Sequence, residues 1–322
     1  MKRPIEHPVK QLIECVPNFS EGRDRKRIEG LVGAMSGVPG AWVLDLHTDP
    51  DHNRCVVTLA GEPQPVTEAA LRGVAKAAES IDLRSHSGEH PRIGAIDVLP
   101  FVPIEGVNME ECVALAREAG REIWSRHRIP VYFYEEAALR PERKKLESVR
   151  SGEFEYLREE ASRNPDRAPD IGGPGMHPSA GAVAVGARQF LVAYNINLDT
   201  PDVSVAKEIA RAIRASSGGL PHVKAIGVEL KHRALAQVSM NLTDFERTPI
   251  RVVFDAVRRE AATRNCSIHS SEIVGLVPRK ALEPDDVAYL RLEEFSPGKI
   301  LENRLQSAIN EEEPQRISIR GV

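Results

Sequence analysis

The sequence predicts a mixed α/β protein, an α+β sandwich of two β-α-β-β-α-β subdomains with a cleft between them. Short apolar runs of strand length alternate with segments whose apolar residues repeat at the helical spacing i, i+3, i+4, i+7. The same order of elements occurs in both halves, as expected for split β-α-β sheets with helices on one face. The length of 322 residues suits about two domains. We expect them to span 1–180 and 181–322.

The first half alternates strands and helices, and turn-forming and helix-capping residues mark where some of these elements end or begin. The apolar run 12–16 breaks at Pro17-Asn18, as a strand entering a loop does. Asn108, with Glu111 three residues later, predicts a capping box at the start of a helix. The expected strands span 12–16, 42–46, 55–60, 95–101 and 131–134, and the expected helices span 28–35, 66–81 and 108–127.

The second half repeats this order after a segment, 140–163, that is highly charged and expected to be helical in part. The next segment, 164–181, holds four Pro and four Gly in eighteen residues. Its composition fits either a flexible linker or a long ordered loop with a function. The expected strands span 182–197, 224–230, 235–242 and part of 267–277, and the expected helices span 203–215, 250–263, 282–292 and 299–309.

The composition excludes several classes of protein. With 43 Lys+Arg against 47 Asp+Glu and 41% hydrophobic residues, the chain is too apolar and too balanced to be disordered or broadly basic. We find no signal-peptide core in the first eleven residues and no apolar stretch long enough to span a membrane. We therefore expect a cytoplasmic protein without nucleic-acid or membrane partners.

The cysteines are too widely spaced for a disulfide scaffold or a zinc ribbon. Cys15, Cys55, Cys112 and Cys266 contain no C-x-x-C pair. We expect them to be reduced thiols in the core.

Polar residues concentrate in three segments that follow predicted strands, where functional side chains commonly lie. These are 45–54, 86–92 and the Gly/Pro segment with His177. His86 and His90 stand four apart, but Pro91 disfavours a helical conformation at His90. The His and Asp residues between 47 and 52 match no fixed ligand spacing, so we expect no metal. Dinucleotide, P-loop and nucleophile-elbow motifs are absent from the sequence.

Three long strings resemble the glutamate formimidoyltransferase (formiminotransferase) family. They are ECVPNFSEG at 14–22, GEHPRIGAID at 88–97, and the stretch 182–198 with GAR and YNINL. The resemblance extends over 12–277. It implies transfer of a formimidoyl group between N-formimidoyl-L-glutamate and tetrahydrofolate in histidine degradation. It also implies two subdomains with a folate tunnel between them, in a homodimer that binds folate and glutamate-derived molecules.

The resemblance also implies roles for particular residues. The family's catalytic histidine falls on His90, and its folate-binding loop, where Pro178, Ser179 and Gly181 match most directly, becomes an ordered functional loop here. That loop comprises Gly172, Gly173, Pro174, Gly175, Met176, His177, Pro178, Ser179, Ala180 and Gly181.

The chemistry of the implied reaction points to further candidates. The attacking nitrogen loses a proton and the leaving nitrogen gains one, and a single imidazole at His90 can serve both needs. Asp45 or Asp49 could stabilise the cationic amidine, or form Asx turns instead. Arg54 and Arg92 are candidates for the glutamate carboxylates.

Other candidates are less specific. Arg188 could serve the folate glutamyl tail or a surface ion pair, and Asn195 could read the pterin or orient an amide. His47 stands where the fused animal enzymes carry an acidic residue.

The chain is expected to lack the cyclodeaminase domain to which the animal enzymes are fused. Differences in the loop, including Met176, His177 and Ala180, leave the donor open. The alternatives are a 5-formyltetrahydrofolate–glutamate formyltransferase, a metal-dependent amidohydrolase and a non-catalytic folate carrier.

Overall fold

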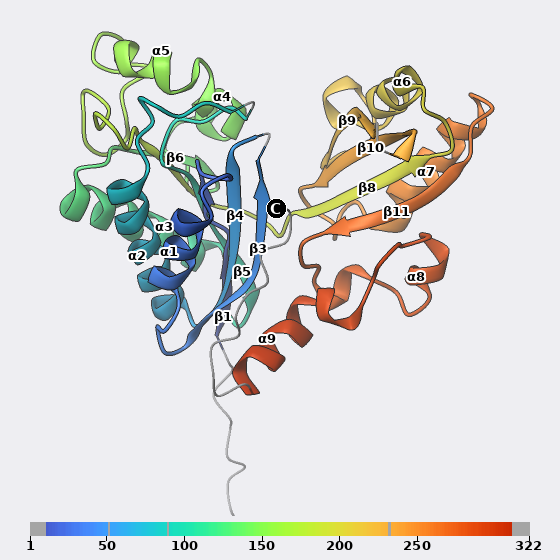
Figure 1. Cartoon of the computed structure of the whole chain (residues 1–322), viewed down its shortest axis with the longest axis horizontal. Coiled ribbons are helices and arrows are strands. Elements are labelled where there is room, and N and C mark those ends of the chain that lie inside the picture. Colours follow the sequence, from blue (N-terminus) through green and yellow to red (C-terminus); the bar gives the residue numbers. More distant parts are fainter. Residues whose placement is uncertain (1–10, 51, 89, 231–232, 311–322) are drawn as a thin grey trace, which may run out of the picture. The chain divides into compact units, whose positions relative to one another are not determined.

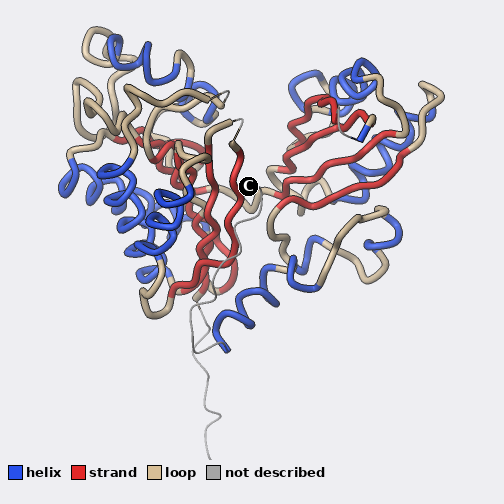
Figure 2. Tube along the Cα trace, viewed as in Figure 1, coloured by secondary structure: helices blue, strands red, loops and turns tan. Residues whose placement is uncertain are grey.

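The structure is a computed structural model that describes residues 11–50, 52–88, 90–230 and 233–310. Asp51 and Glu89, which belong to the polar segments, lie outside the described residues. The chain divides into two compact units. Of the described residues, the first comprises 11–188 with 308–310, and the second comprises 189–307. Figures 1 and 2 show a separate sheet in each unit.

The sheet of the first unit contains seven strands of the described chain. They are β1 (Leu12–Cys15), β2 (Asn18–Phe19), β3 (Ala41–Asp49), β4 (Arg54–Gly61), β5 (Ile96–Glu105), β6 (Val131–Glu135) and β7 (Val183–Ala187). Both β1 and β2 pair with β4 on one side and β5 on the other, so they are two pieces of one interrupted strand. The interruption falls at Pro17, which has no N–H to donate to a ladder. The break predicted at Pro17 is confirmed, but the strand resumes at Asn18 instead of entering a loop there.

Three long helices cover one face of this sheet: α1 (Arg25–Met35), α2 (Pro63–Ser80) and α3 (Met109–His127). Asp24 caps α1 by accepting from the N–H groups of Lys26 and Arg27. The predicted capping box of α3 is confirmed, because Asn108 and Glu111 each accept from the other's N–H. The buried apolar side chains of these helices and of the facing strands form one core, and many of them are Ala, Val, Leu and Ile.

The charged segment after β6 is partly helical, as predicted, and forms α4 (Leu146–Arg150) and α5 (Glu153–Glu160). Val149 of α4 and Leu157 of α5 pack with Tyr132 and Tyr134 of β6 in a second buried cluster. Strand side chains alternate between the two faces of a sheet. These tyrosines therefore face away from Phe133, which belongs to the core under α1–α3. The first sheet thus carries packed elements on both faces rather than one.

The second unit has the predicted β-α-β-β-α-β order. It contains β8 (Val192–Leu198), α6 (Val203–Ile213), β9 (Val223–Leu230), β10 (Leu235–Leu242), α7 (Ile250–Ala262) and β11 (Ile268–Val274). The sheet order β11-β8-β10-β9 is antiparallel throughout. Along β8, buried Tyr194, Ile196 and Leu198 alternate with Asn195 and Asn197, which gives the sheet an apolar face and a polar face.

Three expectations are corrected by the structure. The strand predicted over 182–197 is two strands in different sheets, because β7 pairs in parallel with β5 and β6 of the first sheet. The helix predicted over 282–292 shrinks to α8 (Asp286–Tyr289), whereas α9 (Leu301–Asn310) matches the last prediction well. Cys266 is only partly buried, while the other three cysteines are in the core, and all four are free.

Among the described residues, the structure contains no helix with both the length and the apolar character needed to cross a membrane.

Candidate functional site

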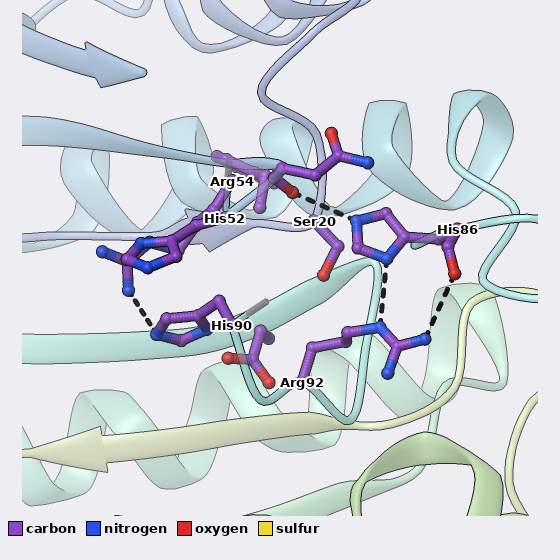
Figure 3. Close-up of a pocket in the computed structure, with 9 residues that line it drawn as sticks. Ser20, His52, Arg54, His86, His90 and Arg92 are labelled. Carbon is purple, nitrogen blue, oxygen red and sulfur yellow. Dashed lines mark hydrogen bonds between the residues drawn. The ribbon is translucent and has the colours of Figure 1, made fainter. Parts of the chain in front are cut away.

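A small pocket in the first unit lies where three chain segments converge: the end of β2, the β3–β4 turn with the start of β4, and the segment that leads into β5 (Figure 3). Two glycines permit this convergence. A Cβ on Gly22 would lie 2.4 Å from the Asp49 carbonyl oxygen, and one on Gly88 would lie 2.3 Å from that of His52. The pocket is lined by Phe19, Ser20, His52, Asn53, Arg54, His86, His90, Arg92 and Asp97.

His90 and Arg54 form the polar centre of this pocket. The Arg54 guanidinium donates from Nη1 to His90 Nε2 at 2.5 Å, so Nε2 carries no proton in this state. Burial, together with the charges of Arg54, Arg150 and His52, lowers the pKa of His90 from 6.5 to about 3. His90 is therefore a neutral imidazole at physiological pH, with the nitrogen that faces Arg54 able to accept a proton.

His86, the other histidine of the predicted segment, is held at both ring nitrogens. Its Nδ1 accepts from Arg92 Nε at 3.0 Å, and its Nε2 lies 3.0 Å from the Asn53 carbonyl oxygen. These contacts require the Nε2–H tautomer, and burial lowers the pKa of this imidazole below its ordinary value. His86 therefore serves as a link between the two segments and has no ring nitrogen left for proton exchange.

The Arg92 guanidinium uses all five of its N–H donors within the protein. Besides His86 Nδ1, it donates to the His86 carbonyl oxygen, to Glu153 and twice to Glu155. Both glutamates belong to α5, so this buried arginine joins the pocket to that helix. The structure places Arg92 at the pocket, as the sequence predicts, but leaves it no donor for a substrate carboxylate.

A third arginine, Arg150 of α4, pairs with the buried carboxylate of Asp97, which lines the pocket. The other Asp97 oxygen accepts from the Ile93 N–H at 2.8 Å. The buried Nε atoms of Arg54 and Arg150 have no hydrogen-bond partner among the described residues. Burial and the charge of Arg150 lower the pKa of Arg54. The pocket therefore has cationic donors to spare, which favours an anionic ligand.

Asp49 and His52 form an acid–imidazole pair at the rim of the pocket. Asp49 Oδ1 accepts from the His52 backbone N–H at 2.9 Å, and Asp49 Oδ2 lies 2.8 Å from His52 Nδ1. The second contact is an ion-pair contact and not an aligned hydrogen bond. The rings of His52 and His90 are 5.9 Å apart between centroids and tilted by 59°.

The Gly/Pro segment is an ordered loop attached to the same part of the first unit. The Ala180 carbonyl accepts from the Ala95 N–H at 2.9 Å, and the Ile93 carbonyl accepts from the Ala182 N–H at 2.9 Å. Gly181 has φ of +70°, and a Cβ there would lie 2.2 Å from the Ile93 oxygen. The loop thus runs directly beside the segment that carries His90, and the linker interpretation is wrong.

The remaining predicted site residues are not among the side chains that line the pocket. Asp45, His47 and Asp49 share one face of β3, and Asp49 is paired in register with Arg54 of β4. His47 is exposed. Asn195 belongs to the second unit, where its amide donates to Glu272 Oε1 at 2.9 Å.

Sequence reasoning did not assign several residues that build the pocket. Asn53 accepts from the Gly22 N–H and donates to the Ser87 carbonyl, which ties the converging segments together. Ser20 donates to the Gly94 carbonyl at 2.7 Å. Arg150 and the two α5 glutamates come from a segment that reads only as highly charged. The string that contains Asp97 was a signal for that residue, whereas the α4 and α5 residues offered none.

No group of three or more His, Cys, Asp and Glu side chains in the described parts of the chain is arranged to hold a metal ion.

The sequence of both units identifies the class of protein to which the chain belongs. Residues 12–188 match the family model described as the formiminotransferase domain, N-terminal subdomain, and residues 193–310 match that of the formiminotransferase domain. The chain therefore belongs to the formiminotransferase family.

Among particular relatives, a glutamate formimidoyltransferase of Thermoplasma acidophilum is 46% identical over 94% of this chain and 99% of that protein. A glutamate formimidoyltransferase of Streptococcus pyogenes is 45% identical over 92% of this chain and 99% of its own length. The formimidoyltransferase-cyclodeaminase of Mus musculus is 45% identical over 84% of this chain but 51% of that protein.

Proposed function

We propose that this protein is a glutamate formimidoyltransferase, which transfers the formimidoyl group between N-formimidoyl-L-glutamate and tetrahydrofolate. The similarity to the Thermoplasma and Streptococcus enzymes along nearly their whole length carries the proposal. Tetrahydrofolate is then a co-substrate, and no metal is required. We place the reaction in histidine degradation, in the cytoplasm, and expect the enzyme to act as a homodimer.

His90 supplies proton transfer in this reaction. The tetrahydrofolate nitrogen attacks the amidine carbon and forms a tetrahedral adduct, and the attacking nitrogen must lose its proton. A neutral imidazole whose Nε2 is free of a proton is suited to accept it. When an anionic substrate pairs with Arg54, the guanidinium charge beside His90 is partly neutralised, and the imidazole becomes a stronger base.

Arg54 is the residue we assign to a glutamate carboxylate. Its Nε has no partner among the described residues, and its Nη1 contact with neutral His90 can be exchanged for a charge-assisted one. Arg92 acts indirectly, because its five donors hold His86 and α5 in place. Asp49 or Asp45 stabilises the cationic amidine from the adjacent face of β3.

We assign folate binding to the loop Gly172–Gly181 and to Asn195. The support for the loop is its attachment beside Ile93 and Ala95, a few residues from His90. His177 stiffens the loop from within, because its Nδ1 accepts from the Ala180 N–H at 3.0 Å.

Steady-state kinetics with purified protein test the function. The protein should consume N-formimidoyl-L-glutamate only when tetrahydrofolate is present, with growth of 5-formimidoyltetrahydrofolate absorbance. His90→Gln should lower kcat by about 10² or more, within the range of general acid–base catalysis.

Three other outcomes are informative. Preferential use of 5-formyltetrahydrofolate with glutamate would establish the formyltransferase alternative. Hydrolysis without tetrahydrofolate that a chelator abolishes would establish the metal-dependent amidohydrolase. Tetrahydrofolate binding without turnover would establish the folate carrier.

A further inference from the structure

We infer that His52 is a second proton-transfer residue of this pocket, acting as the general acid that protonates the departing glutamate nitrogen while His90 acts as the base. The inference rests on the proposed function and divides its two proton transfers between two imidazoles. The observation that carries it is that His52, His90 and Arg54 line one pocket, with the two rings 5.9 Å apart between centroids (Figure 3).

The surroundings of His90 favour this division of labour. His90 is largely buried, and this burial, together with the charges of Arg54, Arg150 and His52, lowers its pKa to about 3. An imidazole in that setting accepts a proton transiently but does not rest as an imidazolium before the reaction begins. A second group that already carries a proton when the adduct forms can protonate the leaving nitrogen without relying on the proton that His90 has just accepted.

Among the histidines that line the pocket, His52 has the contacts that such an acid needs. Asp49 Oδ2 lies against its Nδ1, which orients the ring and leaves Nε2 as the exchanging nitrogen. The described residues give Nε2 no hydrogen-bond partner, and 42% of the side chain is exposed, so solvent can return a proton. His86 does not qualify, because both of its ring nitrogens are engaged.

The proton and bond changes balance over one turnover. The tetrahydrofolate nitrogen forms its bond to the amidine carbon, and its proton passes to His90 Nε2. The adduct then collapses as the glutamate nitrogen takes a proton from His52 Nε2, and its bond to carbon breaks. His90 is left protonated and His52 neutral, so a net transfer of one proton from His90 to His52 through solvent restores the enzyme. In the reverse direction the two histidines exchange roles.

The test compares His52→Gln with wild-type enzyme and with His127→Gln, a variant at the end of α3 far along the chain from the pocket segments. We expect His52→Gln to lower kcat by about 10²-fold at neutral pH with both KM values within about twofold, in keeping with loss of one acid–base residue. His127→Gln should match wild type.

The leaving-group dependence separates an acid from a merely structural residue. N-formimidoyl-4-fluoroglutamate releases a less basic amine, which needs less protonation, so the defect of His52→Gln should shrink with this donor. An equal defect with both donors, or a kcat within about twofold of wild type, overturns the inference. His52→Asn, a second neutral replacement at the same position, should show the same defect with the same leaving-group dependence. This variant decides between the two outcomes if His52→Gln does not fold.

Among the described residues, the charged groups around the two imidazoles are Asp49, Arg54, Asp97 and Arg150, so kcat is measured in each variant at matched pH and ionic strength. If wild-type enzyme fails to transfer the formimidoyl group, the proposed function fails and this inference with it. If wild type transfers the group and His52→Gln behaves like it, only the assignment of His52 fails.

Discussion

Replacing Arg54 by Gln should raise the pKa of His90, because it removes the nearest cation from the imidazole. Arg54 Nη1 lies 2.5 Å from His90 Nε2. Two unit charges about 4 Å apart interact by about 1 kcal/mol in water and about 4 kcal/mol at an effective dielectric constant of about 20. Since the pocket is partly open, the repulsion between Arg54 and a protonated His90 lies between these limits, and Arg54→Gln removes it. At 1.36 kcal/mol per pKa unit, this loss of repulsion raises the pKa of His90 by about one to three units.

The measurement is a pH titration of the imidazole resonances in protein labelled with ¹³C-histidine, with His90→Gln used to assign the signal. In wild type, the neutral base form persists until the pH falls towards the pKa of about 3. In Arg54→Gln it should be lost at a correspondingly higher pH, and the acidic limb of kcat/KM should move the same way. Arg25→Gln, at an exposed arginine paired with Glu29, is the control. If His90 titrates at the same pH in wild type, Arg54→Gln and Arg25→Gln, the reasoning is refuted.

Three further predictions address the surrounding structure. Burial raises the pKa of Glu14 from 4.5 to about 7, so the folded state binds more protons between these values. The free energy of unfolding should therefore fall by up to about 3 kcal/mol as the pH rises from 5 to 8, and urea titrations of Glu14→Gln should lack this fall. Arg92→Lys should lower the free energy of unfolding by about 1–3 kcal/mol, because lysine has fewer hydrogen-bond donors and leaves some partners of Arg92 unpaired. Unchanged stability with a raised KM would instead show that Arg92 binds the substrate. Asn108→Ala should cost about 1 kcal/mol through loss of the capping box, seen in urea, with kcat unchanged.

Local patterns in the sequence were sufficient to predict most of the fold. The capping box at Asn108 and the break at Pro17 are decided by neighbours a few residues away, and both predictions are confirmed. The parallel pairing of β7 between β5 and β6 was not predictable in this way, because it joins strands separated by long stretches of chain. Nothing within 182–197 indicates that its two ends belong to different sheets.

The candidate site was likewise predictable only where it depends on residues close together in the chain. The sequence identified the segments that carry Arg54, His90 and Arg92, because unusual polar strings follow strands there. It could not distinguish the two arginines, since their roles depend on which partners approach them. Arg92 meets two glutamates of α5, whereas Arg54 meets a neutral imidazole and keeps an unpaired Nε.

By itself, then, the sequence determined the family, the order of the elements and the segments in which the chemistry occurs, because each depends on residues close together in the chain. Only the tertiary structure decided which polar groups are already satisfied. In the folded chain the donors of Arg92 and the ring nitrogens of His86 are engaged by other groups of the protein, and His52 lies beside His90. The physical reason is that hydrogen-bond partners, burial and electrostatic fields arise from residues that folding brings together, and no local pattern encodes them.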